Sequence, residues 1–460
     1  MKKYFFVLIC LLLAGAFLFA QSDDDLFGGD DDFFGDDDFL IEEVTEVTAS
    51  SDLSKGVLFQ DGSIKIGGNF STSIETSTIL YADDDKDFLE HLSDAKITPN
   101  VGAYLTVDAR PLQDLRMYSK FGFRYPFSSK AVSQLDMSSG GMPEVKTSVT
   151  DWIYLKEMFT DFSIADRAFF RFGLHTVTWG AGYFFSPVSD IINSTMINPE
   201  DVEAQVDGSF NLRTQITFPD SQNCLWLYVL PAFDYAKNCA FAGKYDLVLG
   251  GWELGFGGYW KYEAPPKLTF TASGSIKKLN LFGEAVFQYG SDREWYEDDD
   301  DKTPVFKATA GFSYTWKDPS ITLAGQYLYD GNNFSLDMNS AADQLYFAKN
   351  PMSLKDNMTK GHNAALALSF GRIAGTTKLT AAVFGMVNFG KEELPGVVTD
   401  LLKEYGAESL LNCGTFSAML NYAPVDSITL GIGPYMTFVD WDSKPEVSLK
   451  VSFTLGGGKF

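Results

Sequence analysis

From about Asp61 onward, apolar and polar residues alternate along the chain in one long run after another. In one run Phe306, Ala308, Ala310, Phe312, Tyr314 and Trp316 are separated by Lys307, Thr309, Gly311, Ser313 and Thr315. A period of two is that of a β-strand whose two faces meet different surroundings. Many runs extend over about 9–11 residues or more, the length that a tilted strand needs to cross a bilayer. Strands of soluble proteins are shorter, about five or six residues.

We expect about eighteen such strands, with sixteen as the alternative. They lie near 62–80, 97–108, 114–126, 147–162, 167–178, 208–218, 223–233, 239–249, 251–262, 267–276, 278–290, 303–316, 320–330, 361–372, 375–389, 410–423, 426–439 and 446–456.

The lengths of the connections test this count independently. The connection after each even-numbered strand is short, as at 109–111, 163–166, 219–221, 317–319 and 424–425. The long connections, near 81–96, 127–146, 179–207, 291–302, 331–360 and 390–409, all follow odd-numbered strands. Short periplasmic turns alternating with long extracellular loops are typical of bacterial outer-membrane barrels. The sequence therefore predicts an all-β fold, a closed antiparallel transmembrane β-barrel over residues 61–460.

The N-terminus predicts export to the bacterial outer membrane. Lys2 and Lys3 precede an almost wholly apolar run at 4–19, and Ala20 offers a small residue at a cleavage site. We therefore expect residues 1–20 to be a cleaved signal peptide. Residues 21–60 follow as an acidic segment, in which 21–43 hold nine Asp and two Glu but no Lys or Arg. Such a block of like charge repels itself, so we expect a disordered periplasmic tail.

Alternation also assigns side chains to the two faces of each strand. In the third strand Leu115, Met117, Phe121 and Phe123 share the lipid face, which leaves Arg116, Lys120 and Arg124 on the lumen face. In the fifth strand Phe170, Phe172 and Leu174 face lipid, which leaves Arg167, Arg171 and His175 inside. Arg213 of the sixth strand points inward by the same rule. The sequence thus predicts a lumen lined by basic residues, either solvated by water or facing an acidic partner.

The third long loop, 179–207, is the expected acidic partner. It carries the carboxylates Asp190, Glu200, Asp201, Glu203 and Asp207. Asn198 can cap a short helix with Pro199 at its first position.

The start of this loop resembles a segment found in several porin families, where a strand with basic residues leads into Trp-Gly-x-Gly and Ser/Asn-Pro-x-x-Asp. The matching residues here are Trp179-Gly180-Ala181-Gly182 and Ser186-Pro187-Val188-Ser189-Asp190. The resemblance covers about forty residues besides the barrel pattern and identifies no single family. In general porins the third loop folds into the barrel and narrows it. The resemblance therefore implies an outer-membrane channel for passive diffusion of small hydrophilic solutes, with the acidic loop facing the basic lumen. A loop that lies over the mouth of the barrel is the alternative.

The sequence gives no reason to expect an enzyme. His91, His175 and His362 are the only histidines, and neither a Gly-x-Ser-x-Gly elbow nor a metal-spaced His pair occurs. We therefore expect no catalytic residue, cofactor or metal site. The expected partners are outer-membrane lipid, the barrel-assembly machinery during biogenesis and small solutes, with no nucleic acid. Assembly into a homo-oligomer is left open. The alternatives to a porin are a fatty-acid-transporter-like barrel for hydrophobic substrates with an N-terminal hatch, and a surface-exposed adhesin or antigen.

Overall fold

The computed structural model describes residues 59–82, 87–125, 153–192, 194–195, 206–219, 221–232, 235–317, 320–332, 346, 359–390, 412–425 and 427–459. The predicted signal peptide and the predicted acidic tail up to residue 58 lie outside these ranges.

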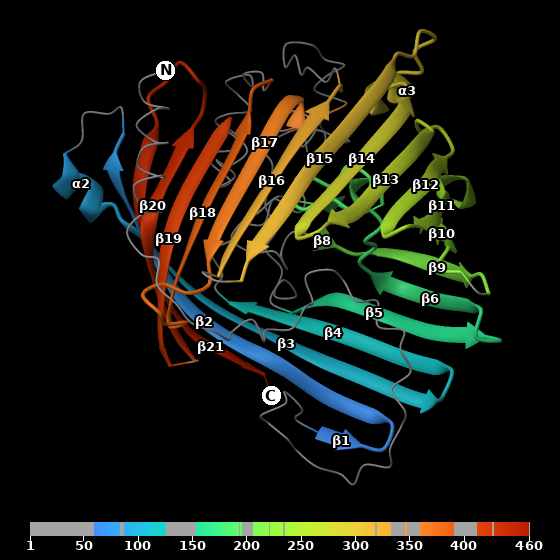
Figure 1. Ribbon diagram of the computed structural model, residues 1–460, viewed down its shortest axis with the longest axis horizontal. Coiled ribbons are helices and arrows are strands. Elements are labelled where there is room, and N and C mark those ends of the chain that lie inside the picture. The colour runs from blue at the N-terminus through green and yellow to red at the C-terminus, as the bar shows by residue number, and fades with distance from the viewer. Residues whose placement is uncertain are drawn as a thin grey trace.

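Eighteen antiparallel strands form one sheet that closes on itself (Figure 1). Each strand pairs with its neighbours in the chain, and the ring is completed where the first strand, β2 (Ile64–Tyr81), pairs with the last, β21 (Glu446–Lys459). In this closing pair Asn69 lies opposite Lys459 and Tyr81 lies opposite Val447. All eighteen predicted strands are present, so the prediction of an eighteen-stranded barrel is confirmed.

The other barrel strands are β3 (Lys96–Leu112), β4 (Leu115–Tyr125), β5 (Ile153–Ile164), β6 (Ala168–His175), β9 (Ser209–Thr217), β10 (Cys224–Leu230), β11 (Ala240–Leu249), β12 (Trp252–Lys261), β13 (Lys267–Ile276), β14 (Leu279–Tyr289), β15 (Pro304–Trp316), β16 (Ile321–Asp330), β17 (Gly361–Phe370), β18 (Leu379–Asn388), β19 (Gly414–Val425) and β20 (Ile428–Phe438). The short elements are β1 (Phe59–Asp61), which pairs with the start of β2, β7 (Ser194–Thr195), β8 (Val206–Asp207), the helices α2 (Phe88–Ser93) and α3 (Asp292–Tyr296), and the 3-10 turns η3 (Ser189–Ile191) and η5 (Ala236–Asn238).

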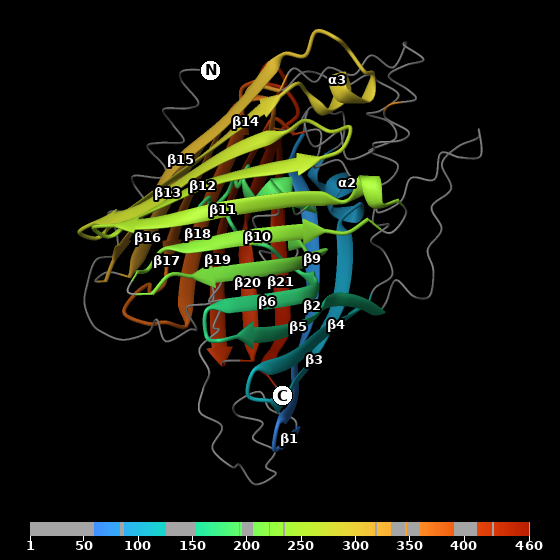
Figure 2. The same cartoon turned by 90° about the vertical axis from the view of Figure 1, so that its right-hand side faces the viewer.

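The two ends of the barrel differ as the connection lengths predicted. Tight turns join strands at one end, such as the turn between β11 and β12, where Gly250 and Gly251 both have positive φ. Helices α2 and α3 lie in connections at the other end (Figure 2). A turn with positive φ suits the twist of antiparallel strands.

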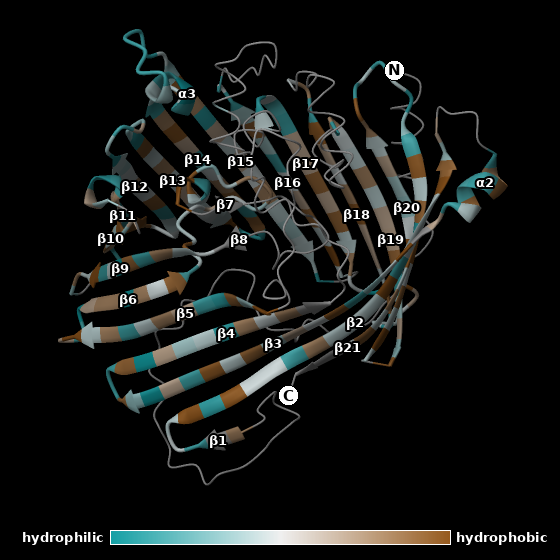
Figure 3. Ribbon diagram, turned by 180° about the vertical axis from the view of Figure 1, so that it is seen from behind, coloured by the Kyte–Doolittle hydropathy of each residue, from teal (hydrophilic) through white to brown (hydrophobic). Residues whose placement is uncertain are grey.

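Burial alternates along the strands in the same period as the sequence. On β13, Leu268 and Phe270 are exposed whereas Thr269 and Thr271 are buried. Figure 3 shows the corresponding bands of apolar and polar residues along the strands. The exposed apolar side chains form the outer surface of the ring and the buried polar ones face its interior, which is the reverse of a water-soluble protein. An apolar exterior on a closed sheet is the arrangement that a bilayer requires.

Gly173 is required by the packing of β6 against β5. Its φ is +139°, and a Cβ atom there would overlap the carbonyl oxygen of Met158 and lie 2.7 Å from Cα of Phe159. The ring of its cross-strand partner Phe159 contacts both Arg171 and His175, the residues on either side of Gly173 on the same face of β6.

We predict that Gly173→Ala destabilises the barrel by about 2 kcal/mol or more, since both the backbone conformation and the overlap oppose a methyl group. Gly250→Ala is the matched control. Gly250 also has positive φ, +58°, but a Cβ there would meet no atom within 4 Å, so the cost should be about 1 kcal/mol. The free energy of unfolding of both variants is measured by urea titration. The folded fraction is read on gels of unheated samples, where the folded barrel migrates differently from the unfolded chain. Equal losses would show that the overlap with β5 is unimportant.

Candidate functional site

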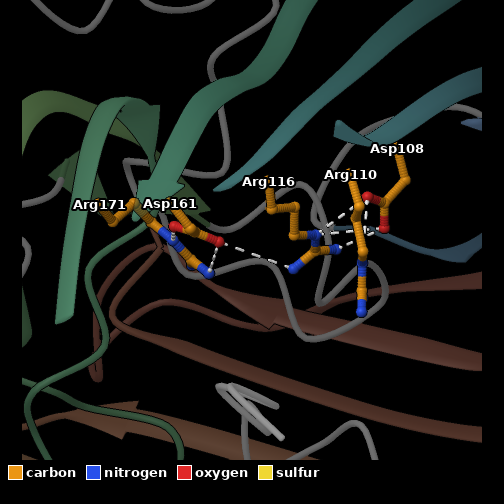
Figure 4. Close-up of polar contacts among 5 residues, drawn as sticks. All are labelled: Asp108, Arg110, Arg116, Asp161 and Arg171. Carbon is orange, nitrogen blue, oxygen red and sulfur yellow. Dashed lines mark hydrogen bonds and ion pairs between the residues drawn. The ribbon is translucent and has the colours of Figure 1, made fainter. Parts of the chain in front are cut away.

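A row of alternating charges crosses the inner face of β3, β4, β5 and β6 (Figure 4). Arg171 on β6 donates two hydrogen bonds to Asp161 on β5, from Nε at 2.7 Å and from Nη2 at 3.1 Å. Arg116 on β4 donates to Asp108 on β3 at 3.2 Å and 2.9 Å, and its Nη1 lies 3.8 Å from Oδ2 of Asp161. Arg110 closes the row 3.7 Å from Asp108. We call these five residues the Arg/Asp row.

Aromatic rings lie beneath two of the three arginines of the row, Arg171 and Arg116. The guanidinium carbon of Arg171 lies 4.0 Å from the centre of the Phe159 ring, and that of Arg116 lies 5.2 Å from the Tyr118 ring. The two rings stack on each other at 5.1 Å. Rings and carboxylates together hold the planar guanidinium groups in fixed orientations. The Arg/Asp row is therefore a rigid, charged strip and not a set of freely moving side chains.

The other predicted basic residues have different surroundings. Arg213 lies directly across from Arg171 in the β6–β9 pair and is buried, with its guanidinium 5.3 Å from the Trp226 ring. Lys120 lies 4.5 Å from the Tyr104 ring. His175 is fully buried, with Nδ1 3.3 Å from the carbonyl oxygen of Gly173. Arg167 is exposed in the turn before β6, and the side chain of Arg124 lies outside the described part of the structure.

The first half of the third loop is fastened to the inner face of the opposite strands. Glu284 of β14 accepts hydrogen bonds from the backbone N–H groups of Gly182 at 2.6 Å and Val188 at 2.9 Å, and from the Ser186 hydroxyl at 3.1 Å. Glu284 is 3% exposed, so its charge is compensated by these donors and not by bulk water. One carboxylate thus holds two points of the loop that are six residues apart.

A second attachment lies on β16. Oε1 of Gln326 accepts hydrogen bonds from the backbone N–H groups of Tyr183, Phe184 and Phe185 at 2.6–3.2 Å, and its Nε2 donates to the carbonyl oxygen of Phe185 at 2.6 Å. A third comes from β11, where Nζ of Lys244 donates to the carbonyl oxygen of Trp179 at 3.0 Å. These side chains satisfy backbone groups that a buried loop would otherwise leave unpaired.

Apolar packing completes the attachment. Trp179 and Val188 of the loop are buried against Tyr228 of β10, with the two rings of Trp179 and Tyr228 at 5.5 Å. Phe185 packs in a second cluster with Leu328 of β16 and Phe384 of β18. The contacts of this half of the loop therefore run from β10 to β18, on the other side of the barrel from the Arg/Asp row.

The predicted acidic residues of the loop are only partly described. Asp190 lies in η3 and is half-buried, and its backbone N–H donates to the carbonyl oxygen of Ser186 at 2.9 Å. Glu200, Asp201 and Glu203, with the helix expected to begin near Asn198, lie outside the described residues. Asp207 belongs to β8, whose partner β7 lies within the ring of strands in Figure 3, and its side chain is not described. Among the described residues, the carboxylates that contact Arg116 and Arg171 come from strands.

Sequence reasoning missed these strand carboxylates and the polar side chains that hold the loop. Alternation along each strand assigns Asp108, Asp161, Glu284 and Gln326 to the inner face, just as it assigns the arginines. Alternation does not say which inner residues lie opposite each other, because that depends on the register between neighbouring strands. The signal available for Glu284 was that it is the one charged residue within β14. Asp161 shares β5 with Lys156 and Glu157 and does not stand out in this way.

We predict that Asp161→Asn lowers the free energy of unfolding by about 3 kcal/mol, because two arginines lose a buried partner. Asp166→Asn is the control, since Asp166 is exposed in the adjacent turn and should change stability little. Urea titration of the folded barrel gives both values. Indistinguishable midpoints would mean that Asp161 does not hold the row together.

We predict that Glu284→Gln loosens the loop locally. An amide offers one acceptor oxygen, so the N–H of Gly182 or of Val188 must lose its partner, and amide hydrogen exchange there should quicken by about tenfold or more. Hydrogen-exchange mass spectrometry of peptides within 176–192 measures this. Glu253→Gln, at an exposed position on β12, is the control and should leave exchange unchanged. Unchanged exchange in Glu284→Gln would contradict the proposed attachment.

No group of three or more His, Cys, Asp or Glu side chains that could hold a metal occurs among the described residues. Within the same residues, no helix is both long and apolar enough to span a bilayer.

No protein-family model matches the sequence, and no curated protein matches it. Among solved structures, the chain is similar to the Pseudomonas aeruginosa protein OpdL, with a TM-score of 0.48 at 8% identity over 85% of this chain and 99% of that one. Pseudomonas aeruginosa OccK11 (OpdR) gives a TM-score of 0.46 at 7% identity over 85% and 95% of the two chains. A triple mutant of the Rhodopseudomonas blastica porin gives 0.39 at 9% identity over 85% and 99%. At such low identity the description of the barrel rests on its own strand pairing.

Proposed function

We propose that the protein is a non-enzymatic, porin-type channel of the bacterial outer membrane that admits small hydrophilic solutes by passive diffusion. The third loop, 179–207, would narrow the passage. The observation that carries this proposal is the attachment of the loop's backbone to Glu284 and Gln326 on the inner face of the barrel. A barrel of sixteen to eighteen strands is too wide for its own side chains to fill, and leaves an aqueous channel. A loop attached inside such a barrel restricts that channel without closing it.

The passage would run between the inserted loop and the Arg/Asp row. The loop contacts strands from β10 to β18, whereas the row lies on β3 to β6. The row holds three arginines and two aspartates, and Lys120 and Arg213 adjoin it on β4 and β9. Its net positive charge favours anions over cations, as charged rings do in other aqueous pores.

The polar inner face favours this proposal over a hydrophobic-substrate barrel. Asn211, Thr269, Thr309, Gln326 and Asn363 are all buried polar side chains on inward positions of their strands. An apolar substrate would bury little apolar surface against such a polar wall, so it would gain little by entering. Conductance separates the channel from the adhesin, because a surface antigen needs no open pore.

We predict that the purified barrel conducts ions in a planar bilayer with a preference for anions. Arg116→Gln removes one positive charge from the row and leaves Asp108 with Arg110 as its one partner in the row, so the anion-to-cation permeability ratio should fall. A unit charge about 6 Å from a passing ion in water contributes about 0.7 kcal/mol, or a roughly threefold change. The reversal potential in a salt gradient measures the ratio.

Arg293→Gln provides the control, because Arg293 lies in helix α3 of an external loop and pairs with Glu297. Arg293→Gln should have the same reversal potential as the original protein, within experimental error. A barrel without conductance would overturn the channel proposal, and an unchanged ratio in Arg116→Gln would remove the Arg/Asp row from the passage.

A further inference from the structure

The outer surface of the barrel carries an apolar recess over β10 to β14, the strands that face the viewer in Figure 2. Its volume is about 650 Å³. One row of cross-strand partners runs through it: Leu227 lies opposite Gly243, Gly243 opposite Gly258, Gly258 opposite Leu268, and Leu268 opposite Phe287. Two adjacent glycines in the middle of the row form the floor, and the side chains at either end form the walls.

The recess belongs to the lipid-facing side of the sheet. Leu227, Phe241, Trp260, Leu268 and Phe287 line it, and all five are exposed, Leu268 at 65%. The residues next to them in the chain, such as Tyr228, Ala242 and Thr269, are buried on the inner face. The recess therefore opens into the hydrocarbon of the bilayer.

Neither glycine of the floor is required by its neighbours. A Cβ at Gly243 would lie 3.4 Å from Cδ2 of Leu227, and one at Gly258 would lie 3.3 Å from the carbonyl oxygen of Lys267. A side chain at Gly258 therefore requires that carbonyl to shift by a few tenths of an ångström. Neither residue has positive φ. Glycine weakens a strand interior, and where packing does not demand it, it marks a place where another molecule approaches the backbone closely.

The extracellular end of the recess offers a cation. Phe241 and Trp260 lie there with ring centroids 6.1 Å apart, at the level where aromatic residues mark the edge of the hydrocarbon. The ring of Tyr262, in the turn two residues after Trp260, lies 5.7 Å from Nζ of Lys237. Lys237 is exposed in η5. A positive group just above an apolar recess matches a molecule with an anionic headgroup and a hydrocarbon chain.

We propose that this recess binds an acyl chain of an anionic lipid of the outer leaflet, whose headgroup contacts Lys237. The chain lies over Gly243 and Gly258 between Leu227 and Leu268. The site requires the barrel to lie in a membrane but does not depend on channel activity. A barrel that fails to conduct would leave it intact.

Native mass spectrometry of the full-length protein, released from detergent with phosphatidylglycerol or phosphatidylcholine, tests the site. We expect the protein to retain phosphatidylglycerol in preference to phosphatidylcholine. Gly258→Leu fills the recess and should abolish retention of both lipids. Gly283→Leu is the control, since Gly283 also lies on the outer face but outside the recess. Lys237→Gln should weaken retention of phosphatidylglycerol roughly fivefold, whereas Lys278→Gln, in the turn at the opposite end, should not.

A second measurement needs no change to the floor of the recess. Phosphatidylglycerol brominated in its acyl chain should quench the fluorescence of Trp260 more than brominated phosphatidylcholine at the same mole fraction. The fluorescence of Trp260 is obtained by subtracting the fluorescence of Trp260→Phe from that of the original protein. Equal quenching by the two lipids, or equal loss of retention in Gly258→Leu and Gly283→Leu, would overturn the proposal. If the original protein were a dimer and Gly258→Leu were a monomer, the recess would be occupied by a second copy of the chain. That result would also overturn the proposal.

Discussion

The closing pair β2–β21 is the constraint on which the rest of the structure depends. In hydrocarbon an unpaired backbone N–H or C=O costs several kcal/mol, so an open edge on either strand could not remain in a bilayer. Pairing from Asn69–Lys459 to Tyr81–Val447 removes both edges at once. Once the ring is closed, the two faces of every strand meet different surroundings. The outward face must be apolar. The inward face encloses a space that, in a barrel of eighteen strands, is too wide for the strands' own side chains to fill.

That unfilled space explains why so many buried polar groups line the inner face. The loop that enters it brings backbone N–H groups with no strand partner, and Glu284 and Gln326 accept five hydrogen bonds from them. The strands β3 to β6, which this half of the loop does not contact, carry the Arg/Asp row, where each aspartate lies between two arginines. The inner surface is thus divided into a wall that holds the loop and a wall that keeps fixed charges.

Strand number and faces could be predicted from sequence because both are local properties. Period two is visible within ten residues, and connection lengths follow from the strand positions. The partners of Arg116 and Arg171 could not be predicted, because they depend on the registers of three strand pairs, β3–β4, β4–β5 and β5–β6. The contact between Gly182 and Glu284 spans 102 residues and crosses the barrel. No periodicity encodes such a contact. The resemblance of the loop to porin loops suggested its entry but not its anchors.

Strand β12 shows how one residue type serves opposite purposes on the two faces. On the inner face a Cβ at Gly255 would overlap the Thr271 hydroxyl and lie 2.8 Å from Cε of Lys244. Glycine is required there, since it leaves room for Lys244 to pair with Asp246 at 3.0 Å and to reach the carbonyl oxygen of Trp179. Three residues further on, Gly258 faces outward and has no such neighbour. Alternation in Gly255-Phe256-Gly257-Gly258 places the first and last glycines on opposite faces, but the sequence does not say what a side chain at either position would meet. Packing of the lumen explains the first glycine, and we attribute the last to the proposed lipid outside the barrel.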